Sequence, residues 1–136
     1  MSDQFNPQDK PAIYPKFATA PFVWNAVNLA LSTCFFNAMM PCQVIAIGWR
    51  VDVAGLNIGS VSAVVRKVAS SQSVSSGIVL HTGVLDLKVS AGSSGLLTLS
   101  TTASDLLLAT GDSLGFHLTG ISTAAQGCVT VLLQAT

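Results

Sequence analysis

The feature that most constrains the fold is a series of short segments in which apolar and polar residues alternate. Residues 43–53 (QVIAIGWRVDV), 60–69 and 85–90 show the pattern clearly. A period of two turns one face of a strand toward a core and the other toward solvent. The chain also contains no glutamate and is rich in Val, Ile and Thr, which favours strands over helices.

Turn signals built from Gly, Ser and Asn separate these segments at intervals of about ten residues. Further strands are expected within 78–90, which holds one strand or two short ones, and at 96–100, 114–118 and 128–134, whereas 70–77 is expected to be a flexible loop and 91–95 a turn. A series of roughly seven to nine short strands is typical of a sandwich or a barrel. We predict an all-β protein, specifically an antiparallel β-sandwich.

Residues 23–40 fit two structures. Val27, Leu29 and Leu31 alternate with small or polar residues as in a half-buried strand, but Val23, Ala30 and their neighbours also form an apolar stripe at helical spacing. The local pattern does not decide between strand and helix. We predict a strand because the rest of the chain has strand-like patterns.

The prolines and glycines divide the chain at about residue 21. Four of the five prolines lie in residues 1–21, while all eleven glycines lie at or after Gly48. Proline removes backbone donors and favours extended conformations, so residues 1–21 are predicted to form an extended arm, with a β-sandwich domain at 22–136. At about 3.3 Å per residue the arm spans up to roughly 70 Å. A disordered terminus is the alternative. Ile13, Tyr14, Phe17 and Phe22 give this arm apolar anchors, which are expected to contact a neighbouring subunit.

Charge is scarce in this sequence. Half of the residues are hydrophobic, 9% are charged and the formal net charge is zero, against roughly 25% charged residues in ordinary soluble domains. Such a surface is weakly protected against association, which predicts assembly with partners. Six basic residues are too few for a protein that binds nucleic acid through its phosphates, so no nucleic-acid partner is expected.

The uncharged stretch between Lys16 and Arg50 is long enough to cross a membrane, but polar residues are spread through it and Pro41 would break a helix. We therefore expect no membrane helix. The polar N-terminus does not have the pattern of a secretory signal. Three cysteines, Cys34, Cys42 and Cys128, are expected to be reduced thiols, with a Cys34–Cys42 pair as the alternative.

The ionisable residues are poorly suited to catalysis. His81 and His117 are expected to be surface or interface histidines, and no Cys or His pair has metal-ligand spacing. No serine lies in a nucleophile elbow, and no Gly-rich loop has phosphate-binding spacing. We expect no enzymatic activity, no cofactor and no metal.

The order of segments resembles that of small phage structural proteins, in particular head decoration or cement proteins. The resemblance spans about 110 residues and rests on an apolar strand followed by FFNAMMPCQVIAIGWRVDVAG (35–55), a Ser/Gly-rich middle, LLLATGDSLGFHLTG (106–120) and a final VTVLL strand. It implies a jelly roll that assembles on the virion surface, often as a homotrimer, and contacts capsid subunits through terminal segments. No site residue is implied by it.

The leading hypothesis is a phage capsid decoration protein, made in the host cytoplasm, that forms a homotrimer on the head surface and stabilises the major capsid protein shell non-covalently. The alternative is a tail-fibre or receptor-binding module that recognises a host glycan. Its loops would be 70–77 and 91–95, and its exposed aromatic residues would be Trp24 and Trp49.

Overall fold

Ten strands in two antiparallel sheets make up the fold of the residues that the computed structural model describes, which are 15–23, 32–56, 59–120 and 124–136. Their bounds are β1 Pro15–Val23, β2 Ser32–Asn37, β3 Cys42–Val53, β4 Ser62–Val68, β5 Ile78–Val79, β6 Leu85–Asp86, β7 Ser93–Leu97, β8 Leu107–Leu108, β9 Ser113–Thr119 and β10 Gln126–Ala135. Two 3₁₀ turns, η1 (Val74–Ser76) and η2 (Ala103–Leu106), lie between them.

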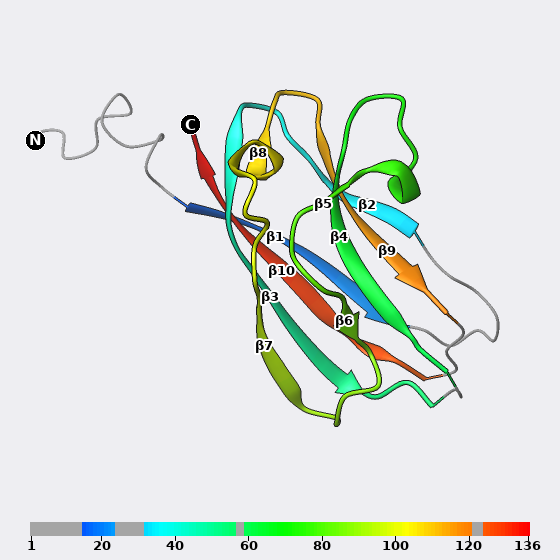
Figure 1. The fold of residues 1–136 in the computed structure, drawn as a ribbon. Coiled ribbons are helices and arrows are strands. Elements are labelled where there is room, and N and C mark those ends of the chain that lie inside the picture. The colour runs from blue at the N-terminus through cyan, green and yellow to red at the C-terminus, as the bar shows by residue number, and fades with distance from the viewer. Residues whose placement is uncertain (1–14, 24–31, 57–58, 121–123) are drawn as a thin grey trace, which may run out of the picture.

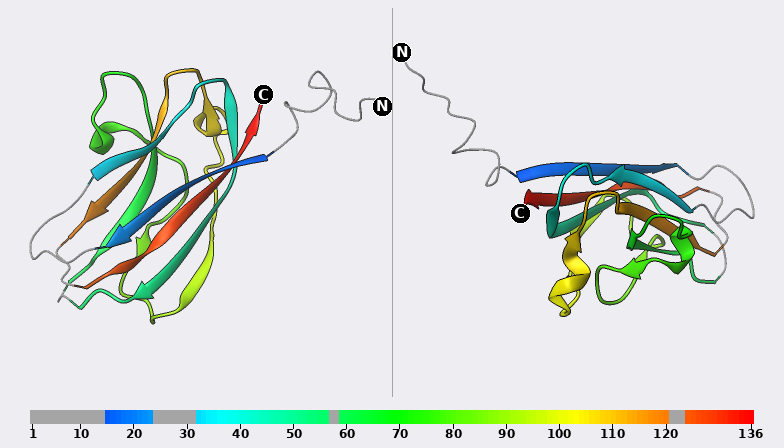
Figure 2. Two further views of the ribbon diagram at one scale, coloured as in Figure 1. Left: turned by 180° about the vertical axis from the view of Figure 1, so that it is seen from behind. Right: turned by 90° about the horizontal axis from the view of Figure 1, so that it is seen from above.

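Sheet A has the order β1-β10-β3-β7, with β8 also paired to β3, and sheet B has the order β2-β9-β4-β5, with β6 also paired to β4. Successive strands alternate between the sheets except for β4 to β6 and β7 to β8. The two sheets pack face to face (Figures 1 and 2). The predicted antiparallel β-sandwich is therefore confirmed, while the jelly roll within that class stays a prediction.

The core lies between the sheets and consists of the inward-facing residues of the long strands. Its largest fully buried side chains are Val44, Ile47 and Val51 of β3, Val129 and Leu133 of β10, Val65 of β4, Leu114 of β9, and Val61, Leu80, Leu87 and Leu108 of the connecting segments and β8. A bulge interrupts β3, because Leu132 pairs with Ala46 while Leu133 pairs with Val44. The extra residue, Ile45, changes which positions face the core.

β1 is the edge strand of sheet A and includes residues 15–21, which the sequence assigned to the arm. Its register with β10 runs from Pro15 opposite Gln134 to Val23 opposite Gln126. An edge strand tolerates proline because one side of its backbone needs no partner. The sandwich therefore begins before residue 22, and residues 1–14 of the expected arm lie outside the described residues.

Three local predictions require correction or completion. The turn expected at 91–95 is partly wrong, because Ser93, Ser94 and Gly95 pair with the long strand β3, whose free edge outweighs their weak strand propensity. The flexible loop expected at 70–77 contains η1. In the ambiguous stretch 23–40, Ser32–Asn37 is strand β2, and residues 24–31 lie outside the described residues.

Candidate interaction surfaces

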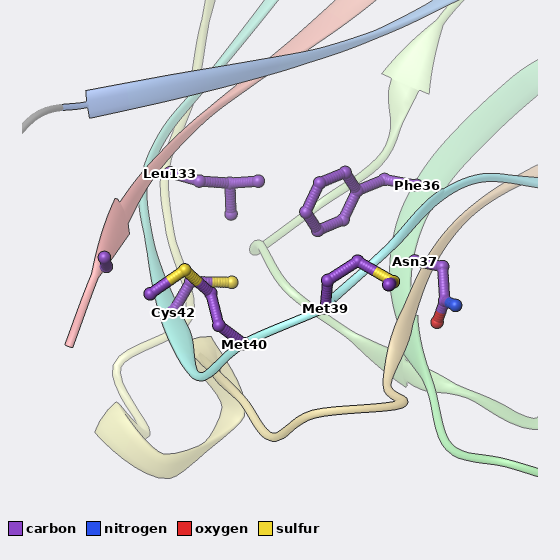
Figure 3. Close-up of a pocket in the computed structure, with 7 residues that line it drawn as sticks. Phe36, Asn37, Met39, Met40, Cys42 and Leu133 are labelled. Atoms are coloured by element: carbon purple, nitrogen blue, oxygen red, sulfur yellow. The ribbon is translucent and has the colours of Figure 1, made fainter. Parts of the chain in front are cut away.

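An apolar pocket opens at the end of the sandwich where the loop between β2 and β3 turns. Met39 and Met40 on this loop are 83% and 48% exposed. The pocket has a volume of about 130 Å³, and its lining comes from both sheets: Phe36, Asn37, Met39, Met40, Cys42, Leu133 and Ala135. Figure 3 shows the labelled side chains grouped around one space. Exposed methionines suit an adaptable contact surface, because the thioether chain is flexible and polarizable.

Backbone hydrogen bonds hold the methionine loop in place. The Ala38 N–H donates to the Asp112 carbonyl at 2.8 Å, and the Gly111 N–H donates to the Ala38 carbonyl at 2.8 Å. On the other side of the loop, the Thr136 N–H donates to the Pro41 carbonyl at 3.2 Å. Ala38 itself is buried. With its flanks fixed in this way, the loop projects its methionines outward.

The outer face of sheet A is a second apolar surface. A shallow hollow on it is lined by Ala46, Gly48, Leu96, Thr130 and Leu132. These positions alternate with buried Ile47 and Val131, so they face away from the core. Leu96 on the edge strand β7 is 76% exposed. Arg50 borders an adjoining groove on this face, and its side chain forms an ion pair with Asp52 at 2.5 Å.

The outer face of sheet B is covered by the chain itself. Gly115 lies under η1, and a Cβ built there would stand 2.7 Å from a methyl group of Val74. Arg66 crosses the same face and donates from Nη1 to the Gly77 carbonyl at 2.6 Å. The Ser32 hydroxyl and His117 Nδ1 are 2.5 Å apart and share a hydrogen bond. Polar groups and a turn thus occupy this face.

His81 is a buried, structural histidine. The prediction that it lies at the surface or at an interface is therefore wrong. Its side chain is 5% exposed, and its Nε2 accepts a hydrogen bond from the Val65 N–H at 3.0 Å. The adjacent Leu80 N–H donates to the Val65 carbonyl at 3.0 Å. The imidazole therefore acts as a partner for β4 between β5 and β6. Burial lowers the pKa of His81, and hydrogen bonds to the Thr82 and Gly83 carbonyls oppose that shift.

The described part of the chain contains three cysteines and four acidic residues. Cys34, Cys42 and Cys128 are free thiols. Burial raises the pKa of Cys42, and the nearby charge of Asp112 raises it further by a smaller amount. Among the described residues, no three His, Cys, Asp or Glu side chains lie close enough to hold a metal ion. Nor does any helix there have the length and apolarity needed to cross a membrane.

The structure describes only the backbone of the predicted contact residues Phe17 and Phe22. Both belong to β1, with Phe17 opposite Leu132 and Phe22 opposite Gly127. Ile13 and Tyr14 lie outside the described residues. The sequence analysis missed the methionine pocket and the bare face of sheet A, although the consecutive Met39, Met40 and Pro41 at a strand end were a signal for an exposed apolar turn.

Comparison with known proteins finds a similar fold but no matching family. No protein-family model matches the chain, and no curated protein sequence does. A chain of the "Cyanophage Pam1 capsid asymmetric unit" is similar with a TM-score of 0.61 at 10% identity, over 99% of this chain and 94% of that one. This likeness supports the two-sheet fold of the described residues.

Two further solved structures show weaker similarity. FlhE matches with a TM-score of 0.47 at 10% identity, over 90% of this chain and 97% of that one. A chain of infectious bursal disease virus, Gx strain, matches with a TM-score of 0.40 at 12% identity, over 99% of this chain and 36% of that one.

Proposed function

We propose that this protein is a non-catalytic structural component of a phage virion, a decoration or cement protein that assembles as a homotrimer on the head surface and stabilises the shell of the major capsid protein. The observation that carries the proposal is the similarity, over nearly the full length of both chains, to a chain of a cyanophage capsid. The scarcity of charge and the two apolar surfaces support a role in assembly.

The strand order supports a jelly roll. In sheet A the last strand, β10, lies between β1 and β3, and in sheet B the strand before it, β9, lies between β2 and β4. The first and last strands that the structure describes, β1 and β10, are therefore neighbours in sheet A, and β2 and β9 are neighbours in sheet B. A jelly roll has eight strands in two sheets, and the four-strand paths β1-β10-β3-β7 and β2-β9-β4-β5 support the proposal of this arrangement here.

The outer face of sheet A is the surface through which we expect copies of the chain to associate. The hollow lined by Ala46, Gly48, Leu96, Thr130 and Leu132 has no charged lining residue, although Arg50 borders the adjoining groove. Removing apolar surface from water stabilises an interface by roughly 25 cal/mol per Å². Sheet B is a weaker candidate because η1 and Arg66 already occupy its outer face.

The oligomeric state tests this assignment directly. Light scattering after size exclusion should give a mass near three times the 14.0 kDa of one chain. Leu96→Lys should reduce that mass toward the monomer, because it places a charge on the proposed interface. Leu56→Lys is the matched control, since Leu56 is 74% exposed and Leu96 is 76% exposed. A monomeric wild-type protein would contradict the trimer, and an assembled Leu96→Lys protein would exclude this face.

The segment before β1 is the part of the arm proposed to reach a capsid neighbour. Residues 1–14, which include Ile13 and Tyr14, span up to about 46 Å when extended. Deletion of residues 1–14 leaves intact every strand that the structure describes, unlike deletion through Pro21, which would remove most of β1. We expect the shortened protein to fold normally. In co-sedimentation with capsids from which this protein is absent, it should bind less than the full-length protein does. Full binding would exclude the arm as a contact.

A glycan-binding module remains the second candidate. Trp49 borders a shallow groove together with Arg50 and Ser94, which combines an aromatic ring with polar groups. The ring is also packed against the core, which limits the area available for stacking on a sugar. Saturable binding on a glycan array that is lost in Trp49→Ala, with the fold preserved, would favour this function over the capsid role.

A further inference from the structure

A polar groove lies beside the start of β4, at the end of sheet B away from η1. Its volume is about 420 Å³, and its lining residues are Gly59, Ser60, Val61, Ser62, Val84, Asp86 and Lys88. This volume falls within the roughly 300–1,000 Å³ that is typical of small-molecule sites. Figure 1 shows β6 beside the start of β4, with the coil of η1 near the other end of that strand.

Two alternating segments supply the side chains of the groove. In segment 84–88, Leu85 and Leu87 are buried and the other three residues are exposed. In segment 60–63 the two apolar residues are buried as well, whereas the two serines are not. Alternate residues of an extended chain share a face. The valine, the charged residues and the serines of these segments therefore point away from the core.

Backbone pairing holds the two segments side by side. Ser62 stands opposite Asp86 in the β4–β6 pair, and the Leu87 N–H donates to the Val61 carbonyl at 2.9 Å. Residues directly opposite in an antiparallel pair lie close together on one face. The Ser62 hydroxyl and the Asp86 carboxylate are therefore neighbours in the groove.

The charged groups of the groove are held apart from each other. Asp86 Oδ1 accepts a hydrogen bond from the Lys88 N–H at 2.9 Å, and Lys88 Nζ donates to the Gly59 carbonyl at 2.9 Å. The two side chains form no ion pair with each other in the part of the chain that the structure describes. Asp86 Oδ2 and the hydroxyls of Ser60 and Ser62 have no hydrogen-bond partner among the described residues. Donors and acceptors are thus both available to a ligand.

This arrangement favours a neutral ligand with several hydroxyl groups. The groove carries one negative and one positive group, so a ligand with a net charge would face a group of its own sign. A hydroxyl group both donates and accepts, so hydroxyls can bond to the carboxylate, the ammonium group and the serines alike. Val84, which is 59% exposed, supplies an apolar contact for the C–H groups of a sugar ring.

We propose that the groove beside the start of β4 binds a sugar residue, with the Asp86 carboxylate accepting hydrogen bonds from its hydroxyl groups and the Lys88 ammonium group donating to them. These contacts dominate the binding, because hydrogen bonds to charged groups are roughly twice as strong as those between neutral groups. The site is separate from the groove beside Trp49. The inference does not depend on the capsid role.

NMR titration of the ¹⁵N-labelled full-length protein tests the inference. The probes are the methyl glycosides of glucose, galactose, mannose and N-acetylglucosamine. With at least one of them, the amide signals of residues 59–62 and 84–88 should shift in a saturable way. Asp86→Asn keeps an acceptor for the Lys88 N–H but removes the charge, so it should weaken binding by about tenfold or more.

Asp52→Asn is the matched control, because Asp52 lies in β3 of sheet A and does not line the groove. Asp52→Asn and Trp49→Ala should both bind like the wild type, and circular dichroism verifies that each variant is folded. Shifts that saturate with none of the glycosides would overturn the proposal. So would equal binding by Asp86→Asn and the wild type, or a loss of binding in Trp49→Ala alone, which would assign the sugar to the other groove.

Glycine is the competing probe, since its ammonium and carboxylate groups match the two charges of the groove. Saturable binding of glycine, with no binding of the four glycosides, would replace the sugar by a zwitterionic ligand and overturn the proposal. Binding of a glycoside in preference to glycine is the expected result.

Discussion

Gly48 and Gly115 occupy equivalent places, each in the middle of a strand on the outer face of its sheet, but their surroundings differ. A Cβ at Gly115 would stand 2.7 Å from Val74 of η1, whereas a Cβ at Gly48 would meet Leu96 at an ordinary 3.6 Å. Glycine at 115 is needed because another part of the chain lies on that face. Sheet B is thus covered by its own polypeptide at this point, whereas no turn among the described residues lies over Gly48 on sheet A.

The contrast extends to the edges of the sheets. In sheet B, the gap beside β4 between β5 and β6 is filled by Leu80 and by the imidazole of His81. In sheet A, the edge strand β7 presents Leu96 to solvent. A sheet whose outer face is covered and whose backbone groups are already hydrogen-bonded has little to gain from a partner. The apolar surface that stays exposed on sheet A is therefore the more informative guide to function.

The largest effect is expected at the covered edge of sheet B. His81→Ala removes a buried side chain and leaves the Val65 N–H without its acceptor, so we expect a loss of about 2–4 kcal/mol in the free energy of unfolding. Urea unfolding measures it. A loss below about 0.5 kcal/mol, the size of an ordinary surface substitution, would mean that the imidazole does not support β4.

His81 also predicts the direction of the pH dependence. Because its pKa in the folded state lies below the ordinary 6.5, the unfolded chain takes up the proton first. Its contribution to stability is therefore complete above pH 6.5 and is lost as the pH falls below that value. Urea midpoints measured between pH 7.5 and 5 should fall in the wild type. His117→Asn should keep most of this decline, since His117 is the more exposed of the two histidines. A urea midpoint of the wild type that does not change between pH 7.5 and 5 would contradict the lowered pKa of His81.

An intermediate effect is expected where η1 covers sheet B. Gly115→Ala forces a methyl group against Val74, and overpacking of this kind costs about 1–3 kcal/mol. The double variant Gly115→Ala/Val74→Ala should recover part of that loss, because the second change removes the clashing methyl groups. If the changes in the free energy of unfolding were additive in a double-mutant cycle, Val74 of η1 would not pack against position 115.

The smallest effect is expected on the bare face of sheet A. Gly48→Ala has room for its methyl group, and alanine restricts the unfolded chain more than glycine does. We expect stability between the wild-type value and a gain of about 1 kcal/mol, measured by thermal unfolding at a concentration where the chain is monomeric. A marked loss of stability would show that this face is covered as well.

Much of the architecture was predictable from particular segments. The alternation at 43–53, 60–69 and 114–118 identified β3, β4 and β9, because the side-chain period of a strand is two residues and is independent of context. Leu114, Phe116 and Leu118 share the buried face, as expected for residues at that spacing. Ser93–Gly95 was missed because its strand exists only through pairing with β3.

The sequence by itself determined the class of fold and predicted a tendency to associate. Both follow from local pattern and composition: alternating strands require a sheet on each side of a core, and few charges leave much surface apolar. Only the tertiary structure decided which apolar residues remain exposed. The methionine pocket, the cover of Val74 over Gly115 and the burial of His81 each depend on segments distant in the chain meeting in one register. No local pattern contains that register, since the strand pairings that bring these segments together are themselves non-local.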